Sequence, residues 1–139
     1  MNSISKILIA LPVLGTVAGC GLFPPTLVDQ GIVKVDIQKT RPISVSTATV
    51  YRDDGQTVVR GEARFPTWVQ HGIFRGHIDV VLALPDGEIV SQHDIRLTPR
   101  NTSGAHGRTA TFISRFDIEL PQGSTASIQY HDGTHKKTS

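Results

Sequence analysis

The chain of 139 residues has only one cysteine, only one methionine and no marked excess of basic residues. Its single cysteine, Cys20, cannot form a disulfide within the chain, so we expect the hydrophobic core alone to hold the fold. The one methionine is Met1, which argues against a methionine-rich copper-handling protein. The 14 basic residues nearly balance 12 acidic ones and are spread along the chain, which argues against a nucleic-acid binder.

The chain begins with an apolar stretch that has the layout of a secretory signal peptide. Lys6 precedes the run ILIALPVLGTVAG, which ends in the small residues Ala18 and Gly19. This run is too short for a comfortable membrane span, and Pro12 interrupts it. We therefore expect export of the chain across a membrane.

The residues Val17-Ala18-Gly19-Cys20 resemble the lipobox of bacterial lipoproteins. The resemblance implies a signal peptide over residues 1–19, cleavage before Cys20, a diacylglycerol group on its thiol and usually an acylated amine. Two or three acyl chains hold a protein stably at a membrane. Ordinary secretory cleavage near Ala18 or Gly19 is the alternative, and it would leave an exposed free thiol.

Residues 20–30 are expected to form the lipidated cysteine and a short tether. The residue after Cys20 is Gly21 rather than aspartate, which under the sorting rule of Gram-negative lipoproteins implies the outer membrane, periplasmic side. Pro24 and Pro25 favour an extended, semi-rigid spacer. The domain should therefore stand close to the bilayer.

From residue 31 onward apolar and polar residues alternate, and turn signals such as Asp53-Asp54-Gly55 and Pro85-Asp86-Gly87 recur. The alternation predicts seven strands, at 32–38, 43–52, 57–65, 74–84, 88–97, 108–120 and 126–131. Antiparallel strands with one solvated face each predict an all-β, two-sheet sandwich over residues 31–131, followed by a polar tail at 132–139. The pattern resembles immunoglobulin-like or fibronectin-type domains, and a small β-barrel is the alternative.

The most unusual stretch of the expected domain is FPTWVQHGIFRG, residues 65–76, which holds the only tryptophan. Trp68, His71 and Arg75 are our candidates for partner binding, since an exposed Trp beside Arg is a typical interface anchor. The alternative is that Trp68 fills the core of the sandwich. The polar loop at 101–107 is a second candidate for recognition.

Histidines are the remaining candidates for chemistry. His77 and Asp79 lie on one face of a predicted strand, and we expect that face to be exposed to solvent. His93 shares a predicted face with Ile89, Ile95 and Leu97, so it is expected to be partly buried and hydrogen-bonded. We predict no metal and no cofactor apart from the lipid. A copper or zinc site built from His77, Asp79 and nearby histidines is the alternative.

The sequence favours a non-catalytic outer-membrane lipoprotein that acts by protein–protein contact. It has no Gly-x-Ser-x-Gly nucleophile motif, and an acylated Cys20 leaves no thiol nucleophile, so we do not expect an enzyme. The expected role is that of an accessory or adaptor subunit of an envelope, secretion or assembly complex. The alternatives are a periplasmic copper- or zinc-binding protein and a module that binds cell-wall glycan or lipid, with Trp68 as a stacking platform.

Overall fold

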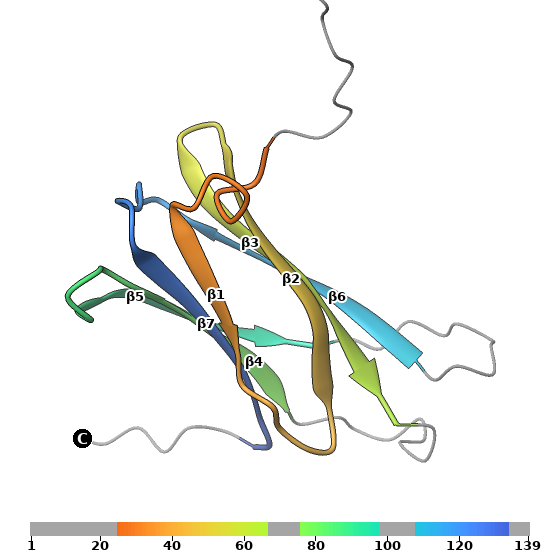
Figure 1. The fold of residues 1–139 in the computed structure, drawn as a ribbon. Coiled ribbons are helices and arrows are strands. Elements are labelled where there is room, and N and C mark those ends of the chain that lie inside the picture. The colour runs from red at the N-terminus through yellow and green to blue at the C-terminus, as the bar shows by residue number, and fades with distance from the viewer. Residues whose placement is uncertain (1–24, 67–75, 98–107, 134–139) are drawn as a thin grey trace, which may run out of the picture.

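A computed structural model describes residues 25–66, 76–97 and 108–133 (Figure 1). The described residues contain seven strands and no helix, which confirms the predicted all-β class. The strands are β1 (Val33–Ile37), β2 (Ser44–Asp53), β3 (Gln56–Phe65), β4 (His77–Ala83), β5 (Ile89–Arg96), β6 (Arg108–Phe116) and β7 (Ser124–His131). β6 ends at Phe116, earlier than its alternation predicted.

The strands form two separate sheets that pack into a sandwich (Figure 1). The four-stranded sheet has the order β1-β7-β4-β5, and the three-stranded sheet has the order β2-β3-β6. Every pairing is antiparallel except that of β1 with β7, the first and last strands. This confirms the two-sheet sandwich over the alternative of a closed barrel. The strand order is not the 1-2-5-4 and 3-6-7 order of immunoglobulin constant domains.

The core lies between the sheets and follows the period-2 alternation of the sequence. In β6 and β7 every second side chain is buried, as predicted for Phe112 and Ile128. Burial of such side chains stabilises the sandwich by roughly 1.5–3 kcal/mol each. Gly61 in β3 lies opposite Phe112, and a Cβ at Gly61 would overlap the phenyl ring. Glycine at this position therefore lets the ring pack directly on the backbone.

The two predicted hairpin turns are both present. Asp54 and Gly55, between β2 and β3, have φ angles of 47° and 79°, as a type I′ turn requires. Between β4 and β5, the Gly87 N–H donates to the Leu84 carbonyl at 2.9 Å, and Gly87 has a φ of 90°. Aspartate and glycine tolerate these positive angles better than most residues, so the sequence encodes both turns locally.

A β-bulge changes which residues of β5 face the core. Leu82 pairs with Ser91 and Ala83 pairs with Ile89, so Val90 is an extra residue in β5. Val90 packs against the core, whereas Ile89 is 62% exposed. The expectation that Ile89 shares the inward face of Ile95 is therefore wrong, because one inserted residue reverses the alternation.

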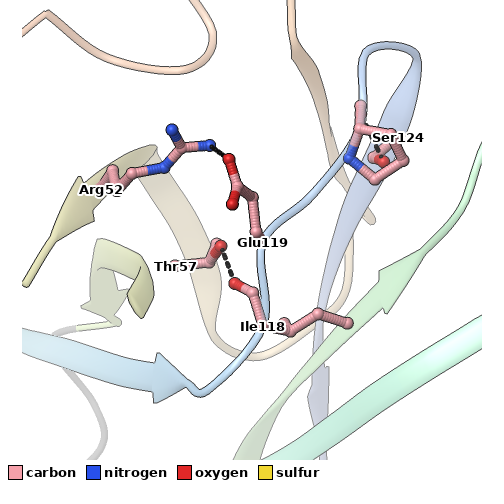
Figure 2. Close-up of polar contacts among 6 residues, drawn as sticks. Arg52, Thr57, Ile118, Glu119 and Ser124 are labelled. Carbon is pink, nitrogen blue, oxygen red and sulfur yellow. Dashed lines mark hydrogen bonds and ion pairs between the residues drawn. The ribbon is translucent and has the colours of Figure 1, made fainter. Parts of the chain in front are cut away.

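Side-chain contacts hold the segment between β6 and β7 against β2 and β3 and stabilise its own turn (Figure 2). The buried Thr57 hydroxyl donates to the Ile118 carbonyl at 2.6 Å, and the Arg52 guanidinium lies 2.8 Å from Glu119 at the surface. The Ser124 hydroxyl donates to the Pro121 carbonyl at 2.7 Å. These contacts fix the connection without regular secondary structure.

The sandwich has two distinct ends. At the first, which we call the entry end, Leu27 packs into the core and its N–H donates to the Val50 carbonyl at 2.7 Å. The turns after β2 and β4 also lie at the entry end (Figure 1). At the opposite end, the far end, Phe65 pairs with Arg108 and His77 pairs with both Arg96 and His131.

Candidate functional site

The candidate partner-binding residues Trp68, His71 and Arg75 lie outside the described residues, as does the loop at 101–107. The described residues that flank them are all at the far end. Pro66 follows β3 there and Gly76 precedes β4, while Leu97 follows β5 and Arg108 begins β6. Both candidate segments therefore join the sandwich at the far end.

A cluster of polar side chains lies at the far end on the outer face of the four-stranded sheet. The register places the cluster in two rows across β5, β4 and β7. One row is Arg96, His77 and His131, and the row beside it is Asp94, Asp79 and Gln129. We call His77, Asp79, Asp94 and His131 the His–Asp cluster.

The carboxylate of Asp79 is the centre of the His–Asp cluster. His77 Nε2 lies 3.0 Å from Asp79 Oδ1, and His131 Nε2 lies 3.0 Å from Asp79 Oδ2. The two imidazole rings stack with their centroids 5.8 Å apart and an interplanar angle of 16°. Each carboxylate oxygen therefore meets one imidazole nitrogen, an arrangement that compensates a charge held away from water.

His77 and Asp79 are buried although they lie on the outward face. Their side chains are 9% and 7% exposed, so the expectation that this face is solvated is wrong here. β4 lies between β5 and β7, and the stacked ring of His131 covers part of the space that water would occupy. The side chain of His131 itself is 40% exposed, so the cluster reaches the surface.

Three members of the His–Asp cluster can hold a metal ion. One ligand atom each from His77, Asp79 and Asp94 lies within 4.8 Å of the other two. Reasoning from the sequence named His77 and Asp79 as neighbours, but it missed Asp94 and His131. Those two reach Asp79 only through strand pairing, which single-strand alternation does not reveal.

A groove runs between β5 and β6, which stand at the edges of their sheets in the described part of the chain. His93 Nδ1 lies 2.6 Å from the Ser114 hydroxyl, and its ring stacks on Phe116 at a centroid distance of 4.2 Å. The predicted hydrogen bond of His93 is thus confirmed, whereas its partial burial is wrong because the residue is exposed. The groove has a volume of about 830 Å³ and is widely open to solvent.

Among the described residues, two side chains have pKa values displaced from their ordinary range. Burial, followed by the nearby charge of Asp132, raises the pKa of the Tyr130 hydroxyl. The hydrogen bond to Asp53 raises the pKa of the Arg115 guanidinium, which keeps that surface pair charged. Neither residue belongs to the His–Asp cluster.

Comparison of the chain with protein-family models, curated proteins and solved structures finds no match. Within the described residues no helix is long and apolar enough for a membrane span.

Proposed function

We propose that this protein is a non-catalytic lipoprotein of the outer membrane that faces the periplasm and binds a partner protein at the far end of its sandwich. It would serve as an accessory or adaptor subunit of an envelope, secretion or assembly complex. The observation that carries this proposal is that the N-terminal segment and the candidate contact segments join opposite ends of the sandwich. The chain leaves the expected anchor at the entry end, and both candidate contact segments join at the far end.

Simple lengths support this arrangement. Pro25 follows Cys20 by five positions, and an extended chain of that length spans at most about 18 Å. The ten-residue strands β2 and β3 are each roughly 33 Å long. A lipid on Cys20 would thus keep the entry end near the bilayer, while the far end extends into the periplasm.

The residue types of the first candidate segment indicate the chemistry of the partner. A Trp side chain supplies a large apolar contact area, and Arg supplies charged hydrogen bonds at the rim of an interface. We therefore expect Trp68 to enter an apolar depression on the partner and Arg75 to meet a carboxylate beside it. The glycan or lipid alternative uses the same tryptophan, so the experiments below distinguish the two.

The anchor is tested with the Cys20→Ser variant in a Gram-negative host. Because serine offers no thiol for the diacylglycerol group, we expect the variant to accumulate as an uncleaved precursor or to leave the membrane fraction. Immunoblots of separated inner-membrane, outer-membrane and periplasmic fractions provide the measurement. A processed variant that still fractionates with the outer membrane would contradict the anchor.

The contact is tested by placing a photo-crosslinking amino acid at Trp68, His71 or Arg75 in the full-length protein in its native host. A matched control carries the crosslinker at Gln122, which is exposed at the entry end. We expect a discrete crosslinked polypeptide from the three candidate positions and none from Gln122. Crosslinks to glycan or lipid, crosslinks only from Gln122, or no crosslinks at all would each overturn the proposal.

A further inference from the structure

We propose that His77, Asp79 and Asp94 together bind one Zn²⁺ ion on the outer face of the four-stranded sheet. The inference rests on the geometry of the His–Asp cluster and does not depend on the proposed membrane anchor or partner. Three features of the cluster support the site. Nitrogen and oxygen donors lie close together, two carboxylates are paired unfavourably, and His131 orients the central Asp79.

The pairing of the carboxylates is the first step. Asp79 and Asp94 are directly opposite each other on β4 and β5. Like charges in this position destabilise a sheet, and the side chain of Asp79 is buried, so water screens its charge poorly. A divalent cation between the two carboxylates would convert this repulsion into attraction.

The distances suit a zinc ion. One donor atom from each of His77, Asp79 and Asp94 already lies within 4.8 Å of the others, and the His77–Asp79 pair is separated by 3.0 Å. Donor atoms on a tetrahedral zinc ion are about 3.4 Å apart, given Zn–N and Zn–O bonds of about 2.1 Å. Asp94 is exposed, so a change of its rotamer can bring its carboxylate to the metal without moving the core.

His131 has a positioning role in this arrangement. It holds Oδ2 of Asp79 at 3.0 Å, which leaves Oδ1 directed toward His77 and available to the ion. Hydrogen bonds of this kind orient metal-binding carboxylates in many sites. Zinc would take the place of the proton between His77 Nε2 and Asp79 Oδ1, and that proton would pass to solvent.

The donor set also favours zinc over magnesium. A site with one imidazole and two carboxylates suits Zn²⁺, whereas Mg²⁺ prefers oxygen ligands and retains most of its water. We therefore expect zinc to bind and magnesium not to compete at equal concentration. The fourth position on the zinc ion would be filled by water.

Titration calorimetry with zinc chloride tests the site on the full chain carrying Cys20→Ser, which removes the thiol as a competing ligand. We expect one site with affinity tighter than micromolar. Asp94→Asn removes a ligand and should weaken binding by at least the roughly tenfold that loss of an outer-shell partner alone costs. His93→Gln is the matched control, because His93 is an exposed β5 histidine outside the cluster, and it should bind zinc unchanged.

Two further readouts separate binding from folding. Without metal, Asp94→Asn should be no less stable than the parent, since it removes a like-charge pair. Zinc should raise the Tm of the parent but not that of Asp94→Asn. Imidazole NMR signals of His77 should shift at one equivalent of zinc while those of His93 stay in place. Affinity no tighter than micromolar, equal binding by Asp94→Asn, weakened binding by His93→Gln, or equal competition by magnesium would overturn the site.

Discussion

Tyr130 couples the stability of this fold to pH through a single side chain. Its ring is 3% exposed and occupies the space that a Cβ on Gly76 would need. Its hydroxyl lies 3.5 Å from Asp132 Oδ1. Burial and this carboxylate raise the pKa of Tyr130 above its ordinary value, so the folded state holds the phenolic proton more tightly than the unfolded state does.

The sign of the pH effect follows from linkage. Below the unfolded pKa of about 10 the contribution of Tyr130 is fully present, and it is lost as the pH rises through the higher folded pKa. We expect the Tm from circular dichroism to decline above about pH 10, and to decline less in Tyr130→Phe. Tyr51→Phe is the control, because it leaves Tyr130 in place and should keep the decline. Equal declines in Tyr130→Phe and the parent would contradict this account.

Single residues also show which burial predictions from the sequence were correct and which were wrong. Alternation placed Phe112 and Ile128 in the core correctly because side-chain direction in a regular strand depends only on local geometry. It failed for Asp79, whose surroundings come from His77 on its own strand, Asp94 on β5 and His131 on β7. The pairing of strands far apart in sequence creates the His–Asp cluster, and no local pattern specifies that pairing.

At the scale of elements, two side-chain contacts hold the connection from β6 to β7 against the three-stranded sheet: the partly buried Thr57–Ile118 hydrogen bond and the exposed Arg52–Glu119 ion pair (Figure 2). Thr57 is 1% exposed and satisfies the Ile118 carbonyl, whereas the side chains of Arg52 and Glu119 are 45% and 73% exposed. The hydrogen bond between Thr57 and Ile118 is partly buried, so water only partly replaces the donor that the Ile118 carbonyl would lose. An exposed ion pair is screened by solvent and contributes little.

Two substitutions separate these contributions. Thr57→Val keeps the shape of the side chain and removes the donor, so it should lower the free energy of unfolding by about 1–3 kcal/mol. Glu119→Gln removes only the exposed charge and should cost no more than about 1 kcal/mol. Urea unfolding followed by circular dichroism measures both. A larger loss for Glu119→Gln than for Thr57→Val would show that the buried bond does not fasten this connection.

The two hairpin turns were predictable from the sequence, whereas the bulge in β5 was not. The turns at Asp54–Gly55 and Pro85–Gly87 were predictable because their backbone angles need particular residues. The bulge at Val90 was not, because the residues around it are ordinary strand formers and the extra residue emerges only from the register with β4. That insertion leaves Ile89 as the most exposed large hydrophobic residue among those described.

At the scale of the whole molecule, Leu27 joins the N-terminal segment to the core. It is 2% exposed, and its carbonyl accepts from the N–H groups of Ile32 and Val33 at 2.9 and 3.1 Å. The segment expected to act as a tether therefore includes residues that pack in the sandwich. This shortens the free spacer after Cys20 and fixes where the chain enters the domain.

Leu27→Ala should reduce the stability of the entire domain because it opens a cavity where the N-terminal segment meets the core. The expected loss is about 2–5 kcal/mol in the free energy of unfolding. The neighbouring residue Val28 is 38% exposed, and Val28→Ala should change that free energy by no more than about 0.5 kcal/mol. Equal losses for the two variants in urea unfolding would show that the N-terminal segment does not contribute to the core.

The parallel pairing of β1 with β7 has a mechanical consequence. β1 begins at the entry end, and β7 runs beside it to the far end over the register from Val33–Ser124 to Ile37–Ile128. A pull on the N-terminal segment, resisted at the far end, acts along these strands rather than across them. Their hydrogen bonds would then bear the load together in shear, and would not open one after another as a zipper does. The pairing of the first and last strands thus suits the domain to transmit tension.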